Sequence, residues 1–203
     1  MKVSVITVAF NSEAYIGETI ESVLAQSYEN LEYWIIEGAG TDATVQKAES
    51  YKQAFAERGI PYHIVSEPDD GIYDAMNKGI GRINGEITGI LNSGDVYKPE
   101  TVSMAVKAFR ETDCELLFGD VEICAGNKVC TVKKARQRKV FQTSRDWNHP
   151  TMFVKSSLYK EYPFQNLGIH DDYGFYLKMR KQKRRIVTIS QVMASFRLGG
   201  MSN

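Results

Sequence analysis

The first hundred residues combine short apolar runs with longer amphipathic stretches. The runs are bounded by turn-forming residues and predict strands, whereas apolar residues three or four positions apart predict helices. This alternation is typical of a mostly parallel sheet with helices on both faces. Ser12 is expected to cap the first helix. The pattern predicts strands over 3–10, 31–36, 62–65 and 87–91, and helices over about 12–26, 43–58 and 72–83.

After residue 100 the pattern is less regular. Two short segments are expected to pair around Gly126-Asn127, which would add a small antiparallel element. No linker divides the chain, so we expect one domain over 1–203 with two halves, about 1–98 and 99–203. The other predicted elements are helices over about 101–110 and 172–181, and strands over 116–119, 151–154 and 186–189.

Composition limits the class of protein. The chain has 203 residues, of which 43% are hydrophobic and 25% charged, as in an ordinary globular domain. No apolar run approaches the roughly 20 residues of a membrane helix, and the N-terminus enters a strand directly, without a signal-peptide pattern. The three cysteines lack metal-ligand spacing, which favours a reducing, cytoplasmic setting.

The net charge of the chain is zero, but its two halves carry net charges of opposite sign. Residues 1–100 carry 7 Lys and Arg against 16 Asp and Glu, whereas residues 101–203 carry 18 against 9. The basic segments 133–139 and 178–185 are interpreted either as solvated faces or as a surface for anionic lipid head groups or a lipid-diphosphate acceptor. Nucleic acid is not expected as a partner, because the whole chain is not basic and no binding motif occurs.

The apolar strand over 87–91 leads into the polar turn Asn92-Ser93-Gly94-Asp95. Ligands of open α/β sheets collect beyond the carboxyl ends of strands, which places Asp95 where a substrate would lie. A carboxylate on a short loop can bind Mg²⁺ or Mn²⁺ that carries a diphosphate. The alternative is that Asp95 only caps the next helix.

Several stretches resemble one family. The turn over 91–95, the motif over 66–79 (SEPDDGIYDAMNKG), and the segments over 3–11 and 22–28 together are similar to the donor-site signature of inverting family 2 glycosyltransferases with the GT-A fold. The resemblance runs in family order from residue 2 to residue 203. It implies a mostly parallel central sheet flanked by helices, a nucleotide-sugar donor half over about 1–98 and an acceptor half over about 99–203.

The resemblance also implies a donor site in which Asp95 holds Mn²⁺ or Mg²⁺. Two positions depart from the family: Gly94 replaces the first of two aspartates, and Glu37 replaces an aspartate that can accept a hydrogen bond from a nucleobase. Asp42 is expected to cap the following helix. The expected donor-binding residues are Thr7, Ala9, Asn11, Glu37, Asp70, Gly71, Asp74, Asn77, Lys78, Asn92, Ser93, Gly94 and Asp95.

In the acceptor half, Asp172 aligns with the acidic residue that family members carry before an aromatic-led helix. An inverting transferase needs a general base to take the proton of the acceptor hydroxyl, and Asp172 is assigned that role, with Asp171 as the fallback. Both could instead be acidic residues at a helix N-terminus, where the helix dipole stabilises negative charge. Trp147, His149 and Asp171 are expected to contact the acceptor, although an isolated histidine is more often structural.

The sequence therefore predicts an inverting glycosyltransferase that moves a sugar from a UDP- or GDP-sugar to a hydroxyl acceptor, a lipid-linked saccharide of polysaccharide biosynthesis. It would act in the cytoplasm or at the inner face of the cytoplasmic membrane. The alternatives are a non-catalytic nucleotide-sugar-binding protein and a nucleotidyltransferase. The last residues, 199–203, resemble a Gly-Gly-Ile-Ser region after which relatives continue, so we expect a chain shorter than its relatives.

Overall fold

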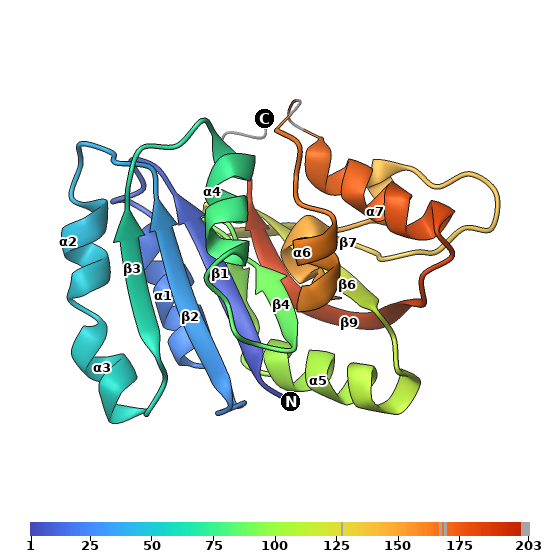
Figure 1. Cartoon of the computed structure of the whole chain (residues 1–203), viewed down its shortest axis with the longest axis horizontal. Helices are drawn as coiled ribbons and strands as arrows, with labels where there is room; N and C mark the ends of the chain where they lie inside the picture. Colours follow the sequence, from blue (N-terminus) through green and yellow to red (C-terminus); the bar gives the residue numbers. More distant parts are fainter. Residues whose placement is uncertain (127, 167, 169, 200–203) are drawn as a thin grey trace.

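A mixed β-sheet runs through both halves of the molecule in the computed structural model, which describes residues 1–126, 128–166, 168 and 170–199 (Figure 1). Within these residues the strand order is β3-β2-β1-β4-β8-β6-β9-β5, and β7 pairs with β6. The strands are β1 (Val3–Ala9), β2 (Leu31–Glu37), β3 (Tyr62–Ser66), β4 (Ile87–Ile90), β5 (Val96–Tyr97), β6 (Leu116–Ala125), β7 (Lys128–Lys133), β8 (Phe153–Lys155) and β9 (Ile186–Arg197).

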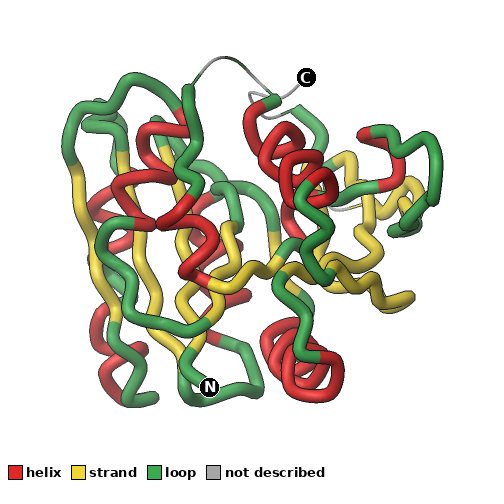
Figure 2. Tube along the Cα trace, turned by 45° about the vertical axis from the view of Figure 1, so that its right-hand side comes forward, coloured by secondary structure: helices red, strands yellow, loops and turns green. Residues whose placement is uncertain are grey.

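The first four strands are parallel, and the second half of the sheet mixes directions. β1 pairs in parallel with both β2 and β4, and β2 pairs in parallel with β3. β8 lies antiparallel to β4 and to β6, whereas β6 and β9 form a long parallel pair. The carboxyl ends of β1, β2 and β4 therefore meet at one edge of the sheet, where loops gather at the top of Figure 2.

Helices cover both faces of the sheet (Figure 1). One face carries α4, α6 and α7, and the other carries α1, α2, α3 and α5, as their buried residues show. The α-helices are α1 (Ile16–Leu24), α2 (Thr44–Glu49), α3 (Lys52–Glu57), α4 (Ile72–Ile80), α5 (Thr101–Thr112), α6 (Ser156–Glu161) and α7 (Asp171–Lys181), and the short 3₁₀ helices are η1 (Ser144–Asp146) and η2 (His149–Thr151).

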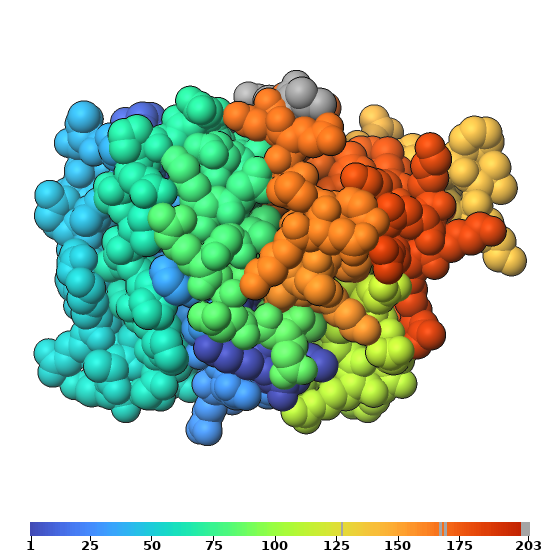
Figure 3. Space-filling view, viewed as in Figure 1, coloured from blue at the N-terminus to red at the C-terminus, as the bar shows by residue number. Residues whose placement is uncertain are grey.

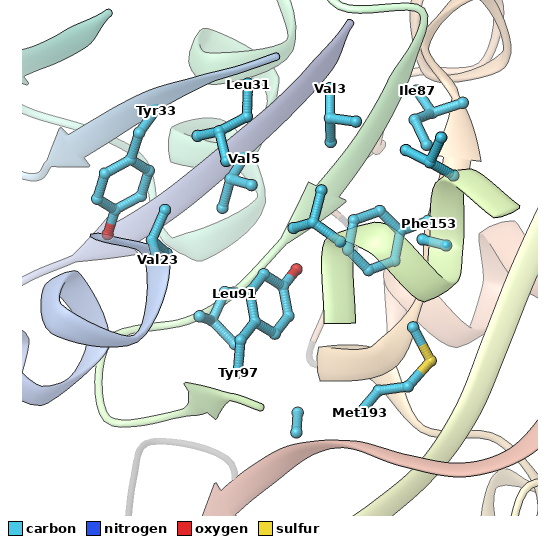
Figure 4. Close-up of a cluster of buried hydrophobic side chains, with 14 of the residues drawn as sticks. Val3, Val5, Val23, Leu31, Tyr33, Ile87, Leu91, Tyr97, Phe153 and Met193 are labelled. Atoms are coloured by element: carbon cyan, nitrogen blue, oxygen red, sulfur yellow. The ribbon is translucent and has the colours of Figure 1, made fainter. Parts of the chain in front are cut away.

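The core is divided into two layers because side chains of β1 alternate between the two faces. Val3 and Val5 pack with the α1–α3–α5 layer, and Ile6 and Val8 pack with the α4–α6–α7 layer. In the first layer Tyr97, Phe153 and Met193 bring three separate strands together (Figure 4). This packing fixes the strand ends from which the polar loops leave. No helix in the described part of the chain is long and apolar enough to cross a membrane.

Most predicted elements are confirmed, but two early boundaries are wrong. The first helix begins at Ile16, and Ser12 does not cap it, since its hydroxyl donates to the carbonyl of Phe10. The predicted helix over 43–58 is broken into α2 and α3. At the break, the hydroxyl of Ser50 bonds to the carbonyl of Lys47 at 2.7 Å, a local contact that competes with the helix.

The later half differs more from its prediction. β6 and β9 extend well beyond the predicted ranges 116–119 and 186–189. Each strand is stabilised by its parallel, bulged pairing with the other, and not by an alternating apolar and polar pattern in its own sequence. Helix α6 was not predicted, and the predicted strand over 151–154 is a 3₁₀ turn followed by β8. The hairpin of β6 and β7 is confirmed, with Asn127 outside the described residues. All three cysteines are free.

Candidate active site

A cavity of about 540 Å³ lies at the carboxyl ends of β1 and β4. Its walls come from the loop after β1, the loop before α4, the turn after β4 and the end of β9. Its volume is in the range of ordinary small-ligand sites. The lining residues are Val8, Ala9, Phe10, Asn11, Ser12, Tyr15, Gly38, Asp69, Gly71, Ile72, Ala75, Asn92, Ser93, Gly94, Asp95, Phe196, Arg197, Leu198 and Gly199.

One wall is formed where β1 ends. Asn11 has a φ of 45°, and its side-chain Oδ1 accepts a hydrogen bond from the backbone N–H of Thr41 at 2.8 Å. This bond ties the loop after β1 to the loop after β2. A Cβ atom at Gly40 would lie 2.5 Å from the same Oδ1, so glycine is required for this close approach. Phe10, which is 51% exposed, supplies an aromatic surface to the cavity.

The loop before α4 contributes Asp69 and Gly71. Oδ1 of Asp69 accepts a hydrogen bond from the N–H of Gly71 at 2.9 Å, and Gly71 has a φ of 110°, a conformation that favours glycine. A Cβ atom at Gly38 would collide with Oδ2 of Asp69. Gly38 thus allows the Asp69 carboxylate to lie against the end of β2. Asp69 was not among the predicted donor-binding residues, which included its neighbour Asp70 instead.

The turn after β4 presents polar atoms without partners. Oδ1 of Asn92, Oγ of Ser93 and Oδ2 of Asp95 are buried and have no hydrogen-bond partner in the described part of the chain. Gly94 has a φ of 99°, and its N–H donates to Oγ1 of Thr19 at 2.9 Å. This backbone conformation gives a physical reason for glycine at position 94. The turn is well suited to present oxygen atoms to a ligand.

Asp95 is 3% exposed, and burial raises the pKa of its carboxyl to about 7. The N–H of Arg197, which donates to Oδ1 at 3.2 Å, and the charges of His149 and Arg197 oppose this rise. Desolvation wins because Oδ2 has no donor of its own. A cation bound at Oδ2 would favour the charged form.

Arg197 is a cavity residue that the sequence analysis missed. Its guanidinium lies 5.0 Å from the centre of the Tyr15 ring and contacts Glu18, and Nε lies 3.4 Å from the carbonyl oxygen of Gly94. The long parallel pairing of β9 with β6 carries Arg197 to the turn that contains Asp95. The cavity therefore holds a fixed positive charge beside a buried carboxyl.

The unpartnered oxygen atoms of the cavity fit a divalent metal ion whose remaining ligands would be substrate phosphates and water. Oδ2 of Asp95 and Oδ1 of Asn92 are hard oxygen atoms without partners. No group of three or more His, Cys, Asp or Glu that could hold a metal occurs among the described residues. Mg²⁺ in particular is often bound by one or two carboxylates together with substrate phosphates and water.

A second polar cluster surrounds Asp172 in the first turn of α7. Nδ1 of His149 lies 3.0 Å from Oδ2 of Asp172, and the hydroxyl of Tyr73 donates to Oδ1 at 3.0 Å. Burial alone would raise the pKa of Asp172, but His149, the N–H of Tyr173 and the Tyr73 hydroxyl hold it below its usual value. Nε2 of His149 is buried and has no hydrogen-bond partner in the described part of the chain.

Several predicted ligand residues are instead engaged within the protein. Thr7 is buried, and its hydroxyl oxygen accepts a hydrogen bond from Tyr33 at 2.8 Å. Glu37 is 1% exposed, and its two oxygens accept hydrogen bonds from Gly40 N–H and Ser66 Oγ, each at 2.7 Å. Neither Thr7 nor Glu37 lines the cavity. The expectation that Glu37 accepts a bond from a nucleobase is therefore corrected: its carboxylate holds the loop after β2.

The α4 residues are corrected in the same way. The side-chain amide of Asn77 makes two bonds to the backbone of Phe164, at 2.8 and 3.0 Å. Lys78 pairs with Asp74 at 2.9 Å and donates to the carbonyl of Pro68 at 2.6 Å. These side chains fix the loop before α4 and the segment before α7. Ala9, Asn11, Gly71, Asn92, Ser93, Gly94 and Asp95 are brought together as expected, whereas Asp70, Asp74, Asn77 and Lys78 do not line the cavity.

Of the expected acceptor residues, Trp147 is a core residue. It is 6% exposed, its ring stacks on Tyr176 at 5.9 Å, and its Nε1–H points to the sulfur of Met152. It is therefore not placed to stack on a sugar ring. Asp171 lines a separate cavity of about 300 Å³ beside Phe164 and Lys178. Asp42 was expected to cap the following helix, but the N-cap residue of α2 is Ala43; Oδ1 of Asp42 accepts a hydrogen bond from the N–H of Thr44 at 2.9 Å.

The family-model comparison assigns residues 4–197 to "Glycosyl transferase family 2". The chain therefore belongs to this family, as predicted from its motifs. An uncharacterized glycosyltransferase of Mycobacterium tuberculosis is 38% identical over 108 residues, which cover 52% of this chain and 39% of that protein. GlyG of Streptococcus pneumoniae is 23% identical over 202 residues, covering 88% of this chain and 66% of that protein. The chain thus spans 39% of the length of the first curated relatives it matches.

Two solved structures share the fold over almost the whole chain. TarS of Staphylococcus aureus in complex with UDP-GlcNAc is 21% identical, with a TM-score of 0.81 over 97% of this chain and 58% of that one. The mannosyltransferase PcManGT of Pyrobaculum calidifontis, in complex with GDP-Man and Mn²⁺, is 17% identical, with a TM-score of 0.78 over 98% and 58%. The predicted GT-A fold is confirmed.

Proposed function

We propose that this chain transfers a sugar from a nucleoside-diphosphate donor to a hydroxyl acceptor with inversion at the anomeric carbon. The observation that carries the proposal is the cavity that Arg197 lines together with Asn92, Ser93 and Asp95, whose side chains each have a buried oxygen without a partner in the described part of the chain. Family membership supplies the class of reaction, and the donors in TarS and PcManGT, UDP-GlcNAc and GDP-Man, indicate the class of ligand.

The donor would lie with its base between Phe10, Gly38 and Asp69. Phe10 offers an aromatic face, and the Asp69 carboxylate next to Gly38 can accept a hydrogen bond from a ring N–H, as found in uracil and guanine. The diphosphate would then reach Asp95 and Arg197. Arg197 is positioned for this contact by Tyr15 and Glu18, which hold its guanidinium beside the turn after β4.

Asp95 and Asn92 would hold a divalent metal, Mn²⁺ or Mg²⁺. When bound, such an ion offsets the charge that develops on the departing nucleoside diphosphate. The protein's part is to keep Oδ2 of Asp95 unpartnered and to fix Oδ1 through the N–H of Arg197. Arg197 would add a second positive charge that needs no ion.

Asp172 would take the proton of the acceptor hydroxyl as that oxygen attacks the anomeric carbon. Its lowered pKa keeps it ionised, and His149 and Tyr73 hold the carboxylate in one orientation. The proton then rests on the Asp172–His149 pair, and the bond from the anomeric carbon to the donor phosphate breaks. The acceptor is proposed to be a lipid-linked saccharide of polysaccharide biosynthesis. The name of a Bacillus subtilis relative, TuaG, which is 32% identical over 123 residues, refers to teichuronic acid biosynthesis and supports this choice.

The first test is a thermal-shift and calorimetric screen of UDP- and GDP-sugars with and without Mn²⁺. A metal-dependent stabilisation by one nucleotide, lost in Asp95→Ala, is expected. Donor binding without hydrolysis or transfer to any saccharide acceptor would instead indicate a nucleotide-sugar-binding protein. No stabilisation by any nucleotide would contradict the proposed donor site.

A further inference from the structure

The segment between β7 and η1 carries two adjacent, strongly exposed apolar side chains. Val140 is 79% exposed and Phe141 is 81% exposed, more than any other large hydrophobic residue in the described chain. They lie in a turn over residues 138–142, the tip loop, which projects from the right-hand edge of the molecule (Figures 1 and 3). A water-facing pair of this kind commonly marks an interaction surface.

The tip loop is held in place by polar contacts at both of its ends. Oε1 of Gln142 accepts a hydrogen bond from the N–H of Arg138 at 3.0 Å, and Nε2 of Gln142 donates to the carbonyl of Arg136 at 2.9 Å. Nε of Arg138 bonds to Asp146 at 2.9 Å, and Arg180 of α7 donates to the carbonyl of Arg138 at 2.6 Å. The turn is therefore ordered at its base, while its apolar residues point outward.

The charges around the tip loop are positive. Arg136, Lys139 and Arg145 are exposed, and no ion pair involves them among the described residues. Asp146, which bonds to Arg138 of the loop, is buried, and Asp120 is buried and paired with Lys134. Exposed apolar residues that are flanked in the chain by unpaired cations match a surface that is anionic outside and apolar beneath.

The second basic segment, 178–185, is balanced by ion pairs only in part. Arg184 pairs with Glu115 at 3.1 Å and Glu161 at 3.7 Å, and Arg185 pairs with Asp113 at 3.0 Å. Lys181 and Lys183 are exposed, and no ion pair involves them among the described residues.

The segment 133–139 is paired to a similar extent, through Lys134 and Arg138, so charge alone does not separate the two segments. They differ in their apolar neighbours, because Val140 and Phe141 are far more exposed than Leu177 on α7, which is 40% exposed.

We propose that the tip loop docks this protein on an anionic lipid surface, with Val140 and Phe141 inserted among the lipids and Arg136, Lys139 and Arg145 at the head groups. The acidic half of the chain would then face away from the membrane. Tyr173, the neighbour of Asp172, donates to the carbonyl of Gln142 at 3.0 Å, so the docked surface lies close to the proposed base. The closeness of the docked surface to a catalytic base rests on the proposed function, whereas the docking itself does not.

The test is co-sedimentation of the 203-residue chain with phosphatidylcholine vesicles and with vesicles that also contain phosphatidylglycerol. Binding to the anionic vesicles alone, weakened by salt, is expected. Phe141→Ser should weaken it about tenfold or more, while Phe141→Leu should preserve it. Lys139→Gln with Arg145→Gln should weaken it about fivefold per charge. The matched control, Lys52→Gln with Lys107→Gln, removes two exposed charges from α3 and α5 and should have little effect.

A second measurement locates the contact. Phe141→Trp should show a blue shift of its fluorescence with anionic vesicles and quenching by brominated lipid, above the background of the native Trp34 and Trp147. Equal vesicle binding by the wild type and Phe141→Ser would overturn the proposal. So would an absence of binding to anionic vesicles, or self-association of the chain that Phe141→Ser abolishes, which would assign the surface to a second copy.

Discussion

Nδ1 of His149 lies 3.0 Å from Oδ2 of Asp172, and this contact joins η2 to the first turn of α7. The hydroxyl of Tyr73 donates to the other carboxylate oxygen at 3.0 Å. Asp172 is thus fixed in orientation by one residue from each of two other elements.

Replacement of Asp172 by Asn is expected to lower the rate of sugar transfer by about 10²–10⁴-fold, because the base is lost while the shape is kept. Donor affinity should change little, since Asp172 does not line the donor cavity. Steady-state kinetics and calorimetry with the donor measure the two effects. Asp171→Asn is the matched control one residue away, and loss of transfer in that variant alone would move the base to Asp171.

Replacement of His149 by Gln is expected to shift the acid limb of the pH–rate profile to higher pH. The contact with His149 lowers the pKa of Asp172, so its loss should raise that pKa. Asp172 would then become protonated at a higher pH and transfer would fail earlier on acidification. An unchanged acid limb with a uniformly lower rate would show that His149 acts only on packing.

Asp95 is expected to make the protein less stable as pH rises. Its folded-state pKa of about 7 lies above the ordinary value of 3.8, so its contribution to stability is complete below about pH 4 and lost as pH rises through 7. This rise in the pKa corresponds to about 4 kcal/mol at most. Asp95→Asn should remove this dependence and raise the unfolding midpoint at about pH 8 without metal. Thermal unfolding of the wild type and of Asp95→Asn across pH, without divalent cations, measures this dependence. The same dependence of the unfolding midpoint on pH in both proteins would contradict the assignment.

The sequence predicts the parallel half of the fold well because its strands are short apolar runs with clear boundaries. It predicts β9 poorly, since that strand depends on its partner β6 and ends at Arg197, far from the other cavity residues in the chain. The motif over 66–79 locates the loop beside the cavity but not the task of each side chain. Asn77 resembles a ligand within that motif, yet it bonds to the backbone of Phe164, a contact that only the folded chain creates.

Replacement of Asn77 by Ala therefore tests a structural role against a ligand role. The variant leaves the backbone N–H and carbonyl of Phe164 without their partner, which should cost about 1–3 kcal/mol of unfolding free energy. Denaturant unfolding measures this loss, and calorimetry should find donor affinity nearly unchanged below the transition. A normal stability with a large loss of donor affinity would restore Asn77 to the donor site.

Replacement of Arg197 tests whether different residues bind the diphosphate and the nucleoside of the donor. Arg197→Ala should weaken binding of a nucleoside diphosphate by about tenfold or more, because a hydrogen bond to a charged group is worth about 1.5–3 kcal/mol. Binding of the matching nucleoside should not change, since the proposed base contacts lie with Phe10 and Asp69. Arg197→Lys should recover part of the affinity, and Arg110→Ala on α5 removes an exposed arginine elsewhere as a control. Isothermal titration at two salt concentrations measures these affinities. Equal losses for nucleoside and nucleoside diphosphate would show that Arg197 shapes the cavity through Tyr15 rather than binding phosphate.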